Sequence, residues 1–363
     1  MTKRILVMAG GTGGHVFPGL AVADQLVKSG WQVHWLGTQG RMEAKIVPKA
    51  GYDISFIDVV GVRNNGLLKL LAAPFKIIKS IYQAHKVIKQ FKPNIVIGLG
   101  GFASGPGGVA AWLNRIPLVI HEQNAVPGLT NKWLSKIASR VFTGFDNTFV
   151  NQAAGDESKY VWLGNPVRTE FAQVIAQEKV NVPLNILVVG GSLGAQILNE
   201  TVPLVIKDLQ QQVMVVHQTG AGHLAKVQQT YQVLNIDEQA YQLSEFIDDI
   251  PAAYAQADLV ICRAGALTVA EVAAAGVPAI FVPLPHAVDD HQTKNAQVLV
   301  AAKAAYLLPQ RELSVSSLNK ILSECIHSPE KLLEMGQQAR TLARLDAAQQ
   351  VAHFCIELSE QAV

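Results

Sequence analysis

Two stretches far apart in the sequence share one pattern, and this repetition limits the chain to a small set of folds. The first, "ILVMAGGTGGHVFPGLAVADQL", begins at Ile5, and the second, "ILVVGGSLGAQILNETVPLVI", begins at Ile186. Each joins an apolar run, a Gly-Gly-Thr/Ser-x-Gly turn and a helical pattern, which is the strand-turn-helix unit of a parallel α/β sheet. The sequence therefore predicts two related α/β units, one in each half of the 363 residues.

Further apolar runs follow each unit at the spacing of alternating strands and helices. They are "QVHWLG", "NIVIGLGG", "PLVIHE" and "RVFTGF" in the first half, then "VMVVHQTG", "DLVICRAG" and "PAIFVPL" in the second. Such continuous Val, Ile and Leu runs are typical of strands buried on both faces. We predict two doubly wound parallel sheets, with an amino-terminal domain over residues 1–165 and a carboxyl-terminal domain over residues 166–340. We expect residues 341–363 to form a final helix that returns to the first domain.

The glycines after the first apolar run have no side chains, so the main chain is accessible where the helix is expected to begin. Main-chain N–H groups can then approach a ligand closely, and the helix start adds its positive dipole end, so the turn predicts an anionic ligand. It lacks the last glycine of Gly-x-Gly-x-x-Gly, and the second run ends without an acid for an adenosine ribose. No turn ends in Gly-Lys-Ser/Thr, so NAD enzymes and P-loop ATPases are both disfavoured.

The two halves of the chain differ in charge. Residues 1–165 hold 18 Lys and Arg against 8 Asp and Glu, whereas the remainder holds 12 against 20. No acidic residue occurs between Asp58 and Glu122, an interval with eight basic residues. We expect an anionic surface or ligand to meet this half. Nucleic acid is disfavoured because the basic stretch lacks interleaved aromatic residues of the stacking type.

Within this interval, "GLLKLLAAPFKIIKSIYQAHKVIKQFKP" interleaves apolar and basic residues at helical spacing. The pattern predicts a basic amphipathic helix on an anionic membrane surface, and the alternative is a core-packed helix with a solvated lysine face. The residues expected to meet the membrane are Leu68, Lys69, Leu71, Phe75, Lys76, Ile78 and Lys79. No run approaches the roughly twenty apolar residues that span a bilayer, and the first is too short for a signal peptide, so we expect a cytoplasmic protein.

The three cysteines, Cys262, Cys325 and Cys355, are widely spaced and form no Cys-x-x-Cys. This spacing disfavours disulfides, zinc sites and redox motifs. We expect all three to be small buried hydrophobic side chains.

Seven motifs in order point to one family. They are "GGTGGHVFPGLAVA", "GGFASGPGGVAAWL", "HEQNAVPGLTNKWL", "GNPVR", "GGSLGAQILN", "EFIDDIPAAYAQADLVICRAGALTVAEVAAAGVPAIFVP" and "HQTKNA". In this order and spacing, over nearly the whole chain, they resemble the MurG family of UDP-N-acetylglucosamine transferases, which belongs to glycosyltransferase family 28. The resemblance implies a GT-B fold, with two Rossmann-like domains facing across a cleft. It also implies transfer of N-acetylglucosamine from UDP-N-acetylglucosamine to the undecaprenyl-linked acceptor lipid I, giving lipid II in peptidoglycan synthesis.

The same resemblance implies roles for individual residues. His15 would be the general base that takes the proton of the acceptor's 4-hydroxyl, and the alternative is a helix-start histidine bonded only to backbone. Donor contacts are implied for Thr12, Gly13, Gly14, Asn124, Arg168, Ser192, Ile247, Ala266, Leu267, Thr268, Val269, Glu271 and Gln292. Of these, Glu271 would hold the ribose, Ile247 the uracil through its backbone, and Arg168 with Ser192 the diphosphate. Leu193 stands where the family pattern leads us to expect glutamine.

Neither a cofactor nor a metal is expected, because helix amino termini and Arg168 can carry the charge of the leaving diphosphate. The stretch "HEQN" also lacks the His-Glu-x-x-His spacing of a zinc site. The resemblance implies a peripheral place on the cytoplasmic face of the inner membrane, with cell-wall or division proteins as partners. Two alternatives stay open: a UDP-N-acetylglucosamine 2-epimerase of the same fold, and a non-catalytic protein that binds a nucleotide sugar. Neither requires the basic amphipathic stretch.

Overall fold

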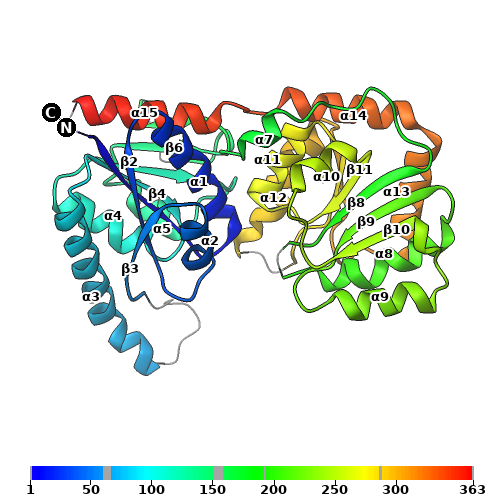
Figure 1. Cartoon of the computed structure of the whole chain (residues 1–363), viewed down its shortest axis with the longest axis horizontal. Helices are drawn as coiled ribbons and strands as arrows, with labels where there is room; N and C mark the ends of the chain where they lie inside the picture. Colours follow the sequence, from blue (N-terminus) through cyan, green and yellow to red (C-terminus); the bar gives the residue numbers. More distant parts are fainter. Residues whose placement is uncertain (1, 60–66, 150–157, 192, 286–287, 362–363) are drawn as a thin grey trace. The chain divides into compact units, whose positions relative to one another are not determined.

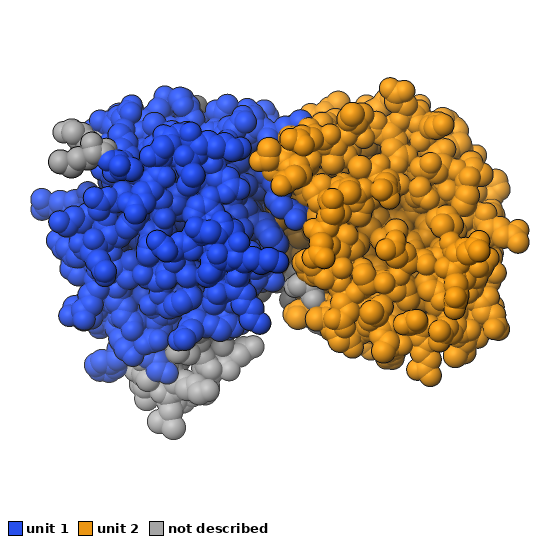
Figure 2. Space-filling model, in the orientation of Figure 1, with its two compact units in different colours: residues 1–168, 344–363 blue, residues 169–343 orange. Residues whose placement is uncertain are grey.

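The computed structural model describes residues 2–59, 67–149, 158–191, 193–285 and 288–361. Within these ranges, the side chains of residues 67–73 and 288 are not described. The chain divides into two compact units (Figure 2). Unit 1 comprises Met1–Arg168 and Arg344–Val363, and unit 2 comprises Thr169–Ala343. The last part of the chain therefore belongs to the same unit as the first.

Among the described residues, unit 1 contains one sheet of seven strands, all parallel, in the order β3-β2-β1-β4-β5-β6-β7. The strands are β1 (Arg4–Ala9), β2 (Gln32–Gly37), β3 (Asp53–Phe56), β4 (Ile95–Gly100), β5 (Leu118–Glu122), β6 (Arg140–Thr143) and β7 (Tyr160–Trp162). The helices are α1 (Gly13–Lys28), α2 (Glu43–Lys49), α3 (Leu67–Phe91), α4 (Ser104–Leu113), α5 (Leu129–Leu134) and α15 (Ala347–Gln361).

The core of unit 1 forms because its central strands are apolar on both faces. Ile5 and Val7 pack on one face of the sheet with α1, while Leu6 and Met8 pack on the other. Helix α15 completes the first of these cores, since Val351 is buried in it and α15 lies against α1 (Figure 1).

Unit 2 repeats this plan with six parallel strands among the described residues, in the order β10-β9-β8-β11-β12-β13. The strands are β8 (Leu184–Val189), β9 (Val213–Gln218), β10 (Tyr241–Ser244), β11 (Leu259–Cys262), β12 (Ala279–Phe281) and β13 (Ala305–Leu307). The helices are α7 (Thr169–Ala172), α8 (Gln196–Asp208), α9 (Leu224–Val233), α10 (Ile250–Gln256), α11 (Ala266–Ala275), α12 (His291–Ala301), α13 (Val315–His327) and α14 (Pro329–Thr341), with 3₁₀ turns η1 (Glu238–Ala240) and η2 (Val288–Asp290).

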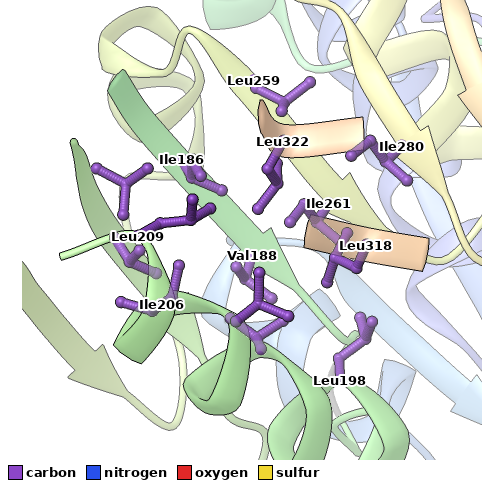
Figure 3. Packing of buried hydrophobic residues seen from close by; sticks show 14 of the residues in the cluster. Ile186, Val188, Leu198, Ile206, Leu209, Leu259, Ile261, Ile280, Leu318 and Leu322 are labelled. Carbon is purple, nitrogen blue, oxygen red and sulfur yellow. The ribbon is translucent and has the colours of Figure 1, made fainter. Parts of the chain in front are cut away.

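The core of unit 2 lies between this sheet and helices α8 and α13. Figure 3 shows Ile186 and Val188 of β8 packed with Ile261 of β11, against Leu198 of α8 and Leu318 of α13. Cys262, Cys325 and Cys355 are buried and free, so the prediction that they serve as small hydrophobic side chains is confirmed.

Both sheets reverse their strand order next to their first strand, between β1 and β4 in unit 1 and between β8 and β11 in unit 2. In open α/β sheets, ligands bind at the carboxyl ends of the strands at such a switch point. The two predicted glycine turns, at residues 10–12 and 190–195, follow β1 and β8. The two doubly wound sheets and their paired glycine turns are confirmed.

Candidate active site

The glycine turn of unit 1 places a histidine at the carboxyl edge of its sheet. Thr12 caps α1 in an extended conformation, so Gly13, Gly14 and His15 form the first turn of the helix. The His15 side chain folds back over the turn, with Nδ1 at 3.1 Å from the Gly10 carbonyl oxygen and 3.5 Å from Thr12 Oγ1. Thr12, Gly13, Gly14 and His15 therefore lie together at the start of α1.

The contact with Gly10 fixes the protonation of the His15 ring. A carbonyl oxygen only accepts hydrogen bonds, so Nδ1 carries the proton and Nε2 keeps its lone pair in the neutral ring. Burial lowers the pKa of His15, against the opposing effects of Glu122, the Gly10 carbonyl and Glu43. The imidazole is thus neutral at neutral pH, with a basic Nε2. Within the described part of the chain, Nε2 makes no hydrogen bond.

The backbone-bonded histidine and the catalytic base were alternatives in the sequence, but the structure makes them compatible. One ring nitrogen of His15 binds the backbone and the other is left to act on a proton. The ring lies beside Gly100, the last residue of β4. Strand β4 neighbours β1 at the switch point of the sheet.

Asn124 is held by the buried carboxylate that ends β5. Glu122 Oε1 accepts from the backbone N–H of Asn124 at 3.0 Å and from its side-chain amide at 3.2 Å. Glu122 Oε2 accepts from Gly128 N at 3.0 Å and from Asn131 Nδ2 at 2.8 Å. One carboxylate therefore organises the whole loop from residue 123 to residue 131. Glu122 therefore orients this loop.

The neighbouring His121 has a different role. Its Nε2 donates to the carbonyl of Gly164 at 2.9 Å inside the core, and burial lowers the pKa of His121 to about 4. The ring is therefore neutral and joins β5 to the segment that follows β7. Arg168, four residues on, extends its guanidinium over the ring of Phe17 in α1, with 5.1 Å to the ring centre. Arg168 thus lies against α1, the helix whose first turn contains His15.

In unit 2, helix α11 begins directly after the carboxyl end of β11. Gly265 is its extended amino-terminal cap, and Gly276 ends it in the left-handed conformation with φ of 67°. The first four helical residues are Ala266, Leu267, Thr268 and Val269. Glu271 follows in the second turn and is buried, close enough to Cys262 to add to the burial that raises the pKa of that thiol.

Three further residues predicted for the donor, Gln292, Ile247 and Ser192, lie outside α11. Gln292 Oε1 accepts from the backbone N–H of Leu284 at 2.9 Å, so its side chain holds the segment after β12. Ile247 lies between β10 and α10 and lines a groove of about 640 Å³ on the sheet face. Ser192 lies outside the described residues. Leu193 beside it is exposed, so it makes no core contact that explains its departure from the family pattern.

Two charged residues near strand ends, Arg263 in unit 2 and Glu43 in unit 1, were not predicted from the sequence. Arg263 follows β11 and donates to the carbonyls of Val282 at 3.0 Å and Pro283 at 3.2 Å, and to Gln310 Oε1 at 2.8 Å. It ties the carboxyl ends of β11 and β12 together beside the start of α11. Glu43 does the same for the glycine turn of unit 1, where its carboxylate accepts from Gly11 N at 2.8 Å. The only sequence signal for either is a charged residue close to a strand end.

Helix α3 carries the predicted membrane residues. The side chains of Leu68, Lys69 and Leu71 lie outside the described part of the chain. From residue 74 to residue 79 every side chain is exposed, with Phe75 at 77% and Ile78 at 64% of its full accessibility. Farther along, Ser80, Ala84 and Ile88 are buried, so this later part of the helix packs on the core.

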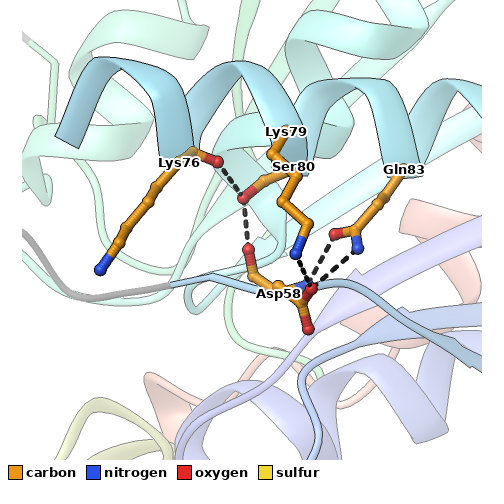
Figure 4. Close-up of polar contacts among 5 residues, drawn as sticks. All are labelled: Asp58, Lys76, Lys79, Ser80 and Gln83. Atoms are coloured by element: carbon orange, nitrogen blue, oxygen red, sulfur yellow. Dashed lines mark hydrogen bonds and ion pairs between the residues drawn. The ribbon is translucent and has the colours of Figure 1, made fainter. Parts of the chain in front are cut away.

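Lys79 is partly neutralised within unit 1. Its ammonium lies 2.8 Å from Asp58 Oδ2, and Gln83 donates to the same oxygen at 2.9 Å (Figure 4). Lys79 and Gln83 hold the pKa of Asp58 below its usual range. Lys76 extends from the same helix away from this cluster in Figure 4, so the two lysines are not equivalent.

Two general features follow from the described residues. No three His, Cys, Asp or Glu side chains among them gather so as to hold a metal ion. Within the described residues, no helix is both long enough and apolar enough to cross a bilayer.

Family models match both halves of the chain. The model of the glycosyltransferase family 28 N-terminal domain matches residues 5–143, and that of the glycosyltransferase family 28 C-terminal domain matches residues 185–351. Together they include the glycine turn and His15 in unit 1, and the start of α11 in unit 2.

Curated relatives match the chain over its full length. A protein of Pseudoalteromonas atlantica named UDP-N-acetylglucosamine--N-acetylmuramyl-(pentapeptide) pyrophosphoryl-undecaprenol N-acetylglucosamine transferase is 59% identical over 372 residues, covering 100% of this chain and 97% of the relative. A protein of the same name from Shewanella loihica is 56% identical over 364 residues, covering 99% and 98%.

Solved structures resemble the chain as a whole. The MurG structure of Acinetobacter baumannii has a TM-score of 0.82 and 43% identity, covering 98% of this chain and 99% of that one. A UDP-GlcNAc 2-epimerase of Neisseria meningitidis bound to UDP-GlcNAc has a TM-score of 0.68, covering 98% and 100%, at 14% identity. At that identity the likeness to the epimerase shows the fold alone.

Proposed function

The chain belongs to glycosyltransferase family 28, and from that premise we propose that it transfers N-acetylglucosamine from UDP-N-acetylglucosamine to lipid I, forming lipid II. It is a hexosyltransferase of peptidoglycan synthesis with the GT-B fold. The observation that carries the proposal is the match of both units, end to end, to relatives named for this transfer. The 2-epimerase alternative is not favoured, since the Neisseria meningitidis 2-epimerase is only 14% identical to the chain.

The transfer is a single displacement with inversion at the anomeric carbon. The 4-hydroxyl oxygen of N-acetylmuramic acid bonds to that carbon while the bond from the carbon to the UDP oxygen breaks and its electrons leave with UDP. His15 Nε2 accepts the proton of the attacking hydroxyl, because this nitrogen has a lone pair and the ring is neutral at neutral pH. No covalent intermediate on the protein is needed.

The donor is assigned to unit 2. The start of α11 offers main-chain N–H groups and a positive dipole end to the diphosphate, and Glu271 accepts hydrogen bonds from the ribose hydroxyls. The backbone at Ile247 binds uracil, and Gln292 with Asn124 contacts the sugar. Arg168 and Ser192 contact the diphosphate, while Thr12, Gly13 and Gly14 lie under the transferred sugar. Each of these roles is proposed from the position of the residue in the family motif.

The acceptor lipid requires the enzyme to reach a membrane, and we assign this contact to α3, on the cytoplasmic face of the inner membrane. Support comes from Phe75 and Ile78, which are exposed on the same helical turn as the exposed Lys76. Helix α4, which packs along α3, ends in exposed Trp112 and Leu113. Apolar and cationic side chains together bind anionic lipid surfaces. Cell-wall or division proteins are the partners expected at that surface.

A transfer assay tests the function directly. The full chain is incubated with radiolabelled UDP-N-acetylglucosamine and a lipid I analogue, and both the lipid-linked disaccharide and the free manno epimer of the donor are quantified. We expect label in the disaccharide and none in the epimer. Epimer formed without the acceptor would overturn the proposal in favour of a 2-epimerase, and donor binding without either product would leave only a nucleotide-sugar-binding protein.

A further inference from the structure

Glu43 is a fully buried carboxylate at the start of α2, and both of its oxygens accept hydrogen bonds. Oε1 accepts from the backbone N–H of Thr38 at 3.0 Å and from its hydroxyl at 2.7 Å. Oε2 accepts from the backbone N–H of Gly11 at 2.8 Å. Its exposed fraction is 0%, and within the described residues no cation pairs with it. An unpaired buried charge is costly, so this arrangement calls for a reason.

The peptide group between Gly10 and Gly11 connects Glu43 to His15. Its N–H, from Gly11, points to Glu43 Oε2 at 2.8 Å, and its carbonyl, from Gly10, points to His15 Nδ1 at 3.1 Å. The carboxylate and the imidazole thus bind the two ends of one planar group. Gly10 permits this approach, because a Cβ atom there would lie 2.3 Å from Glu43 Oε1.

We propose that Glu43 is a positioning residue for the base His15, acting through this single peptide group. Rotating the peptide by half a turn would aim the Gly10 carbonyl at the carboxylate, so Glu43 selects the orientation whose carbonyl faces the ring. That orientation keeps the proton on Nδ1 and the lone pair on Nε2. The inference rests on the proposed function for its effect on catalysis, but its structural content, the choice of tautomer, is independent of it.

The hydrogen bonds that connect Glu43 to His15 through the Gly10–Gly11 peptide group also have an electronic effect. A carboxylate that accepts from an amide N–H polarises the amide, which makes its carbonyl a stronger acceptor for the next donor. The carboxylates of Glu43 and Glu122 are the charged groups that raise the pKa of His15 against the effect of burial. Buried acids that orient a histidine in this manner are worth about ten- to hundredfold where they support metal ligands.

Glu43→Gln is the decisive variant. A carboxamide presents its NH₂ group either to Gly11 N–H or to Thr38 N–H, so two donors meet in both orientations. The hydrogen bond to Gly11 survives only in the orientation that leaves Thr38 N–H without its acceptor. We expect kcat to fall about ten- to hundredfold with the dissociation constant of UDP unchanged, since the proposed uracil and ribose contacts, Ile247 and Glu271, lie in unit 2. The acidic limb of the pH profile should move to lower pH, because the charge that supports the His15 cation is gone while Glu122 remains.

Thr38→Val is the matched control. It removes the hydroxyl donor to Oε1 and keeps the carboxylate and its bond to Gly11. We expect it to lower the melting temperature without changing the pH limb or the His15 tautomer. A purely structural role of Glu43 predicts that both variants lose activity only in proportion to their stability.

The tautomer itself is read from the ¹⁵N shifts of the His15 ring, assigned with His15→Gln. The wild-type protein should show a protonated Nδ1 and a bare Nε2 at pH 7.5, and Glu43→Gln should show a mixture. A wild-type ring protonated on Nε2 would overturn the inference even if Glu43→Gln failed to fold. Absence of transfer by the wild type would overturn the proposed function instead, and the ring shifts would still decide the tautomer.

Discussion

Gly100 lies directly against the imidazole of His15: a Cβ atom at Gly100 would come within 2.7 Å of His15 Cδ2 and 2.8 Å of Nε2. The backbone of Gly100 also has φ of 106°, which other residues rarely adopt. Gly100→Ala should therefore displace the ring and cost about 1–3 kcal/mol of stability from backbone strain. We expect a fall in kcat of about a hundredfold, as for a reacting group misplaced by about 1 Å.

The control for this variant is Gly105→Ala, in α4. A Cβ at Gly105 meets only Thr130 Cγ2 at an ordinary 3.5 Å, and alanine favours helix, so stability and kcat should be kept or raised. Melting curves and initial rates on both variants make the comparison. Equal activity of the two would show that the position of the ring is not limiting.

Replacing His15 by Gln should remove the base and leave donor binding intact. Loss of a general base typically costs about 10²–10⁴ in rate. In the proposed mechanism activity needs neutral His15, so it should be present above the pKa of His15 and lost as the pH falls through it. Because burial holds that pKa below its ordinary value, the acidic limb should lie below about pH 6.5. The measurement is kcat against pH, with the dissociation constant of UDP as the control.

Stability should fall with pH through His121. The ring is neutral and buried with a pKa of about 4, whereas the unfolded chain takes up the proton near pH 6.5. Between these values the unfolded state binds more protons, so the free energy of unfolding decreases as the pH falls, by about 3 kcal/mol in all. Urea unfolding at pH 7.5 and 4.5 measures it.

The comparison for this prediction is His121→Gln. The glutamine does not titrate, so its free energy of unfolding should lose about 3 kcal/mol less between the two pH values than that of the wild type. The buried His217 of unit 2, also with a pKa of about 4, contributes equally to both proteins and cancels. Parallel losses in the two proteins would contradict the assignment.

The lysines of α3 should differ in their effect on membrane binding. Lys76→Glu removes an exposed cation beside Phe75, and each such lysine is worth about 1 kcal/mol near an anionic surface. Lys79 already pairs with Asp58 at 2.8 Å, so reversing it should weaken binding less. Sedimentation with phosphatidylglycerol vesicles measures both, with neutral vesicles as the control. An equal effect of the two variants would argue against α3 as a specific contact.

Chelation should not affect transfer. The proposed diphosphate contacts are the α11 start and Arg168, which carry positive charge without an ion. Activity in EDTA should equal that of the untreated enzyme. Activity that is lost in EDTA and restored by Mg²⁺ would contradict this assignment.

The sequence predicted those parts of the fold that depend on the pattern of consecutive residues. The strand from Arg4 to Ala9, its glycine turn and the helix start at Gly13 follow from one local pattern, and so does the end of α11 at Gly276. The short strands β3, β7, β10 and β13 were missed, because three or four residues at or near a sheet edge need not be apolar.

Contacts between distant residues could not be predicted in the same way. The second strand ends at Gly37 without an acid. Glu43, six residues beyond Gly37, nevertheless returns to the glycine turn and gives its oxygens to Gly11 and Thr38. The pairing of Lys79 with Asp58 likewise depends on where α3 packs after β3. Such links depend on tertiary packing, which no local pattern contains.

The return of α15 to the first unit affects the order in which the two units can fold during translation. Residues 169–343 form one uninterrupted segment, whereas the first unit needs Val351 and its neighbours to cover α1. Synthesis proceeds from the amino terminus, and domains generally fold as units as they emerge. The second unit can therefore finish folding while the first, although translated earlier, waits with an apolar face uncovered until the last helix leaves the exit tunnel.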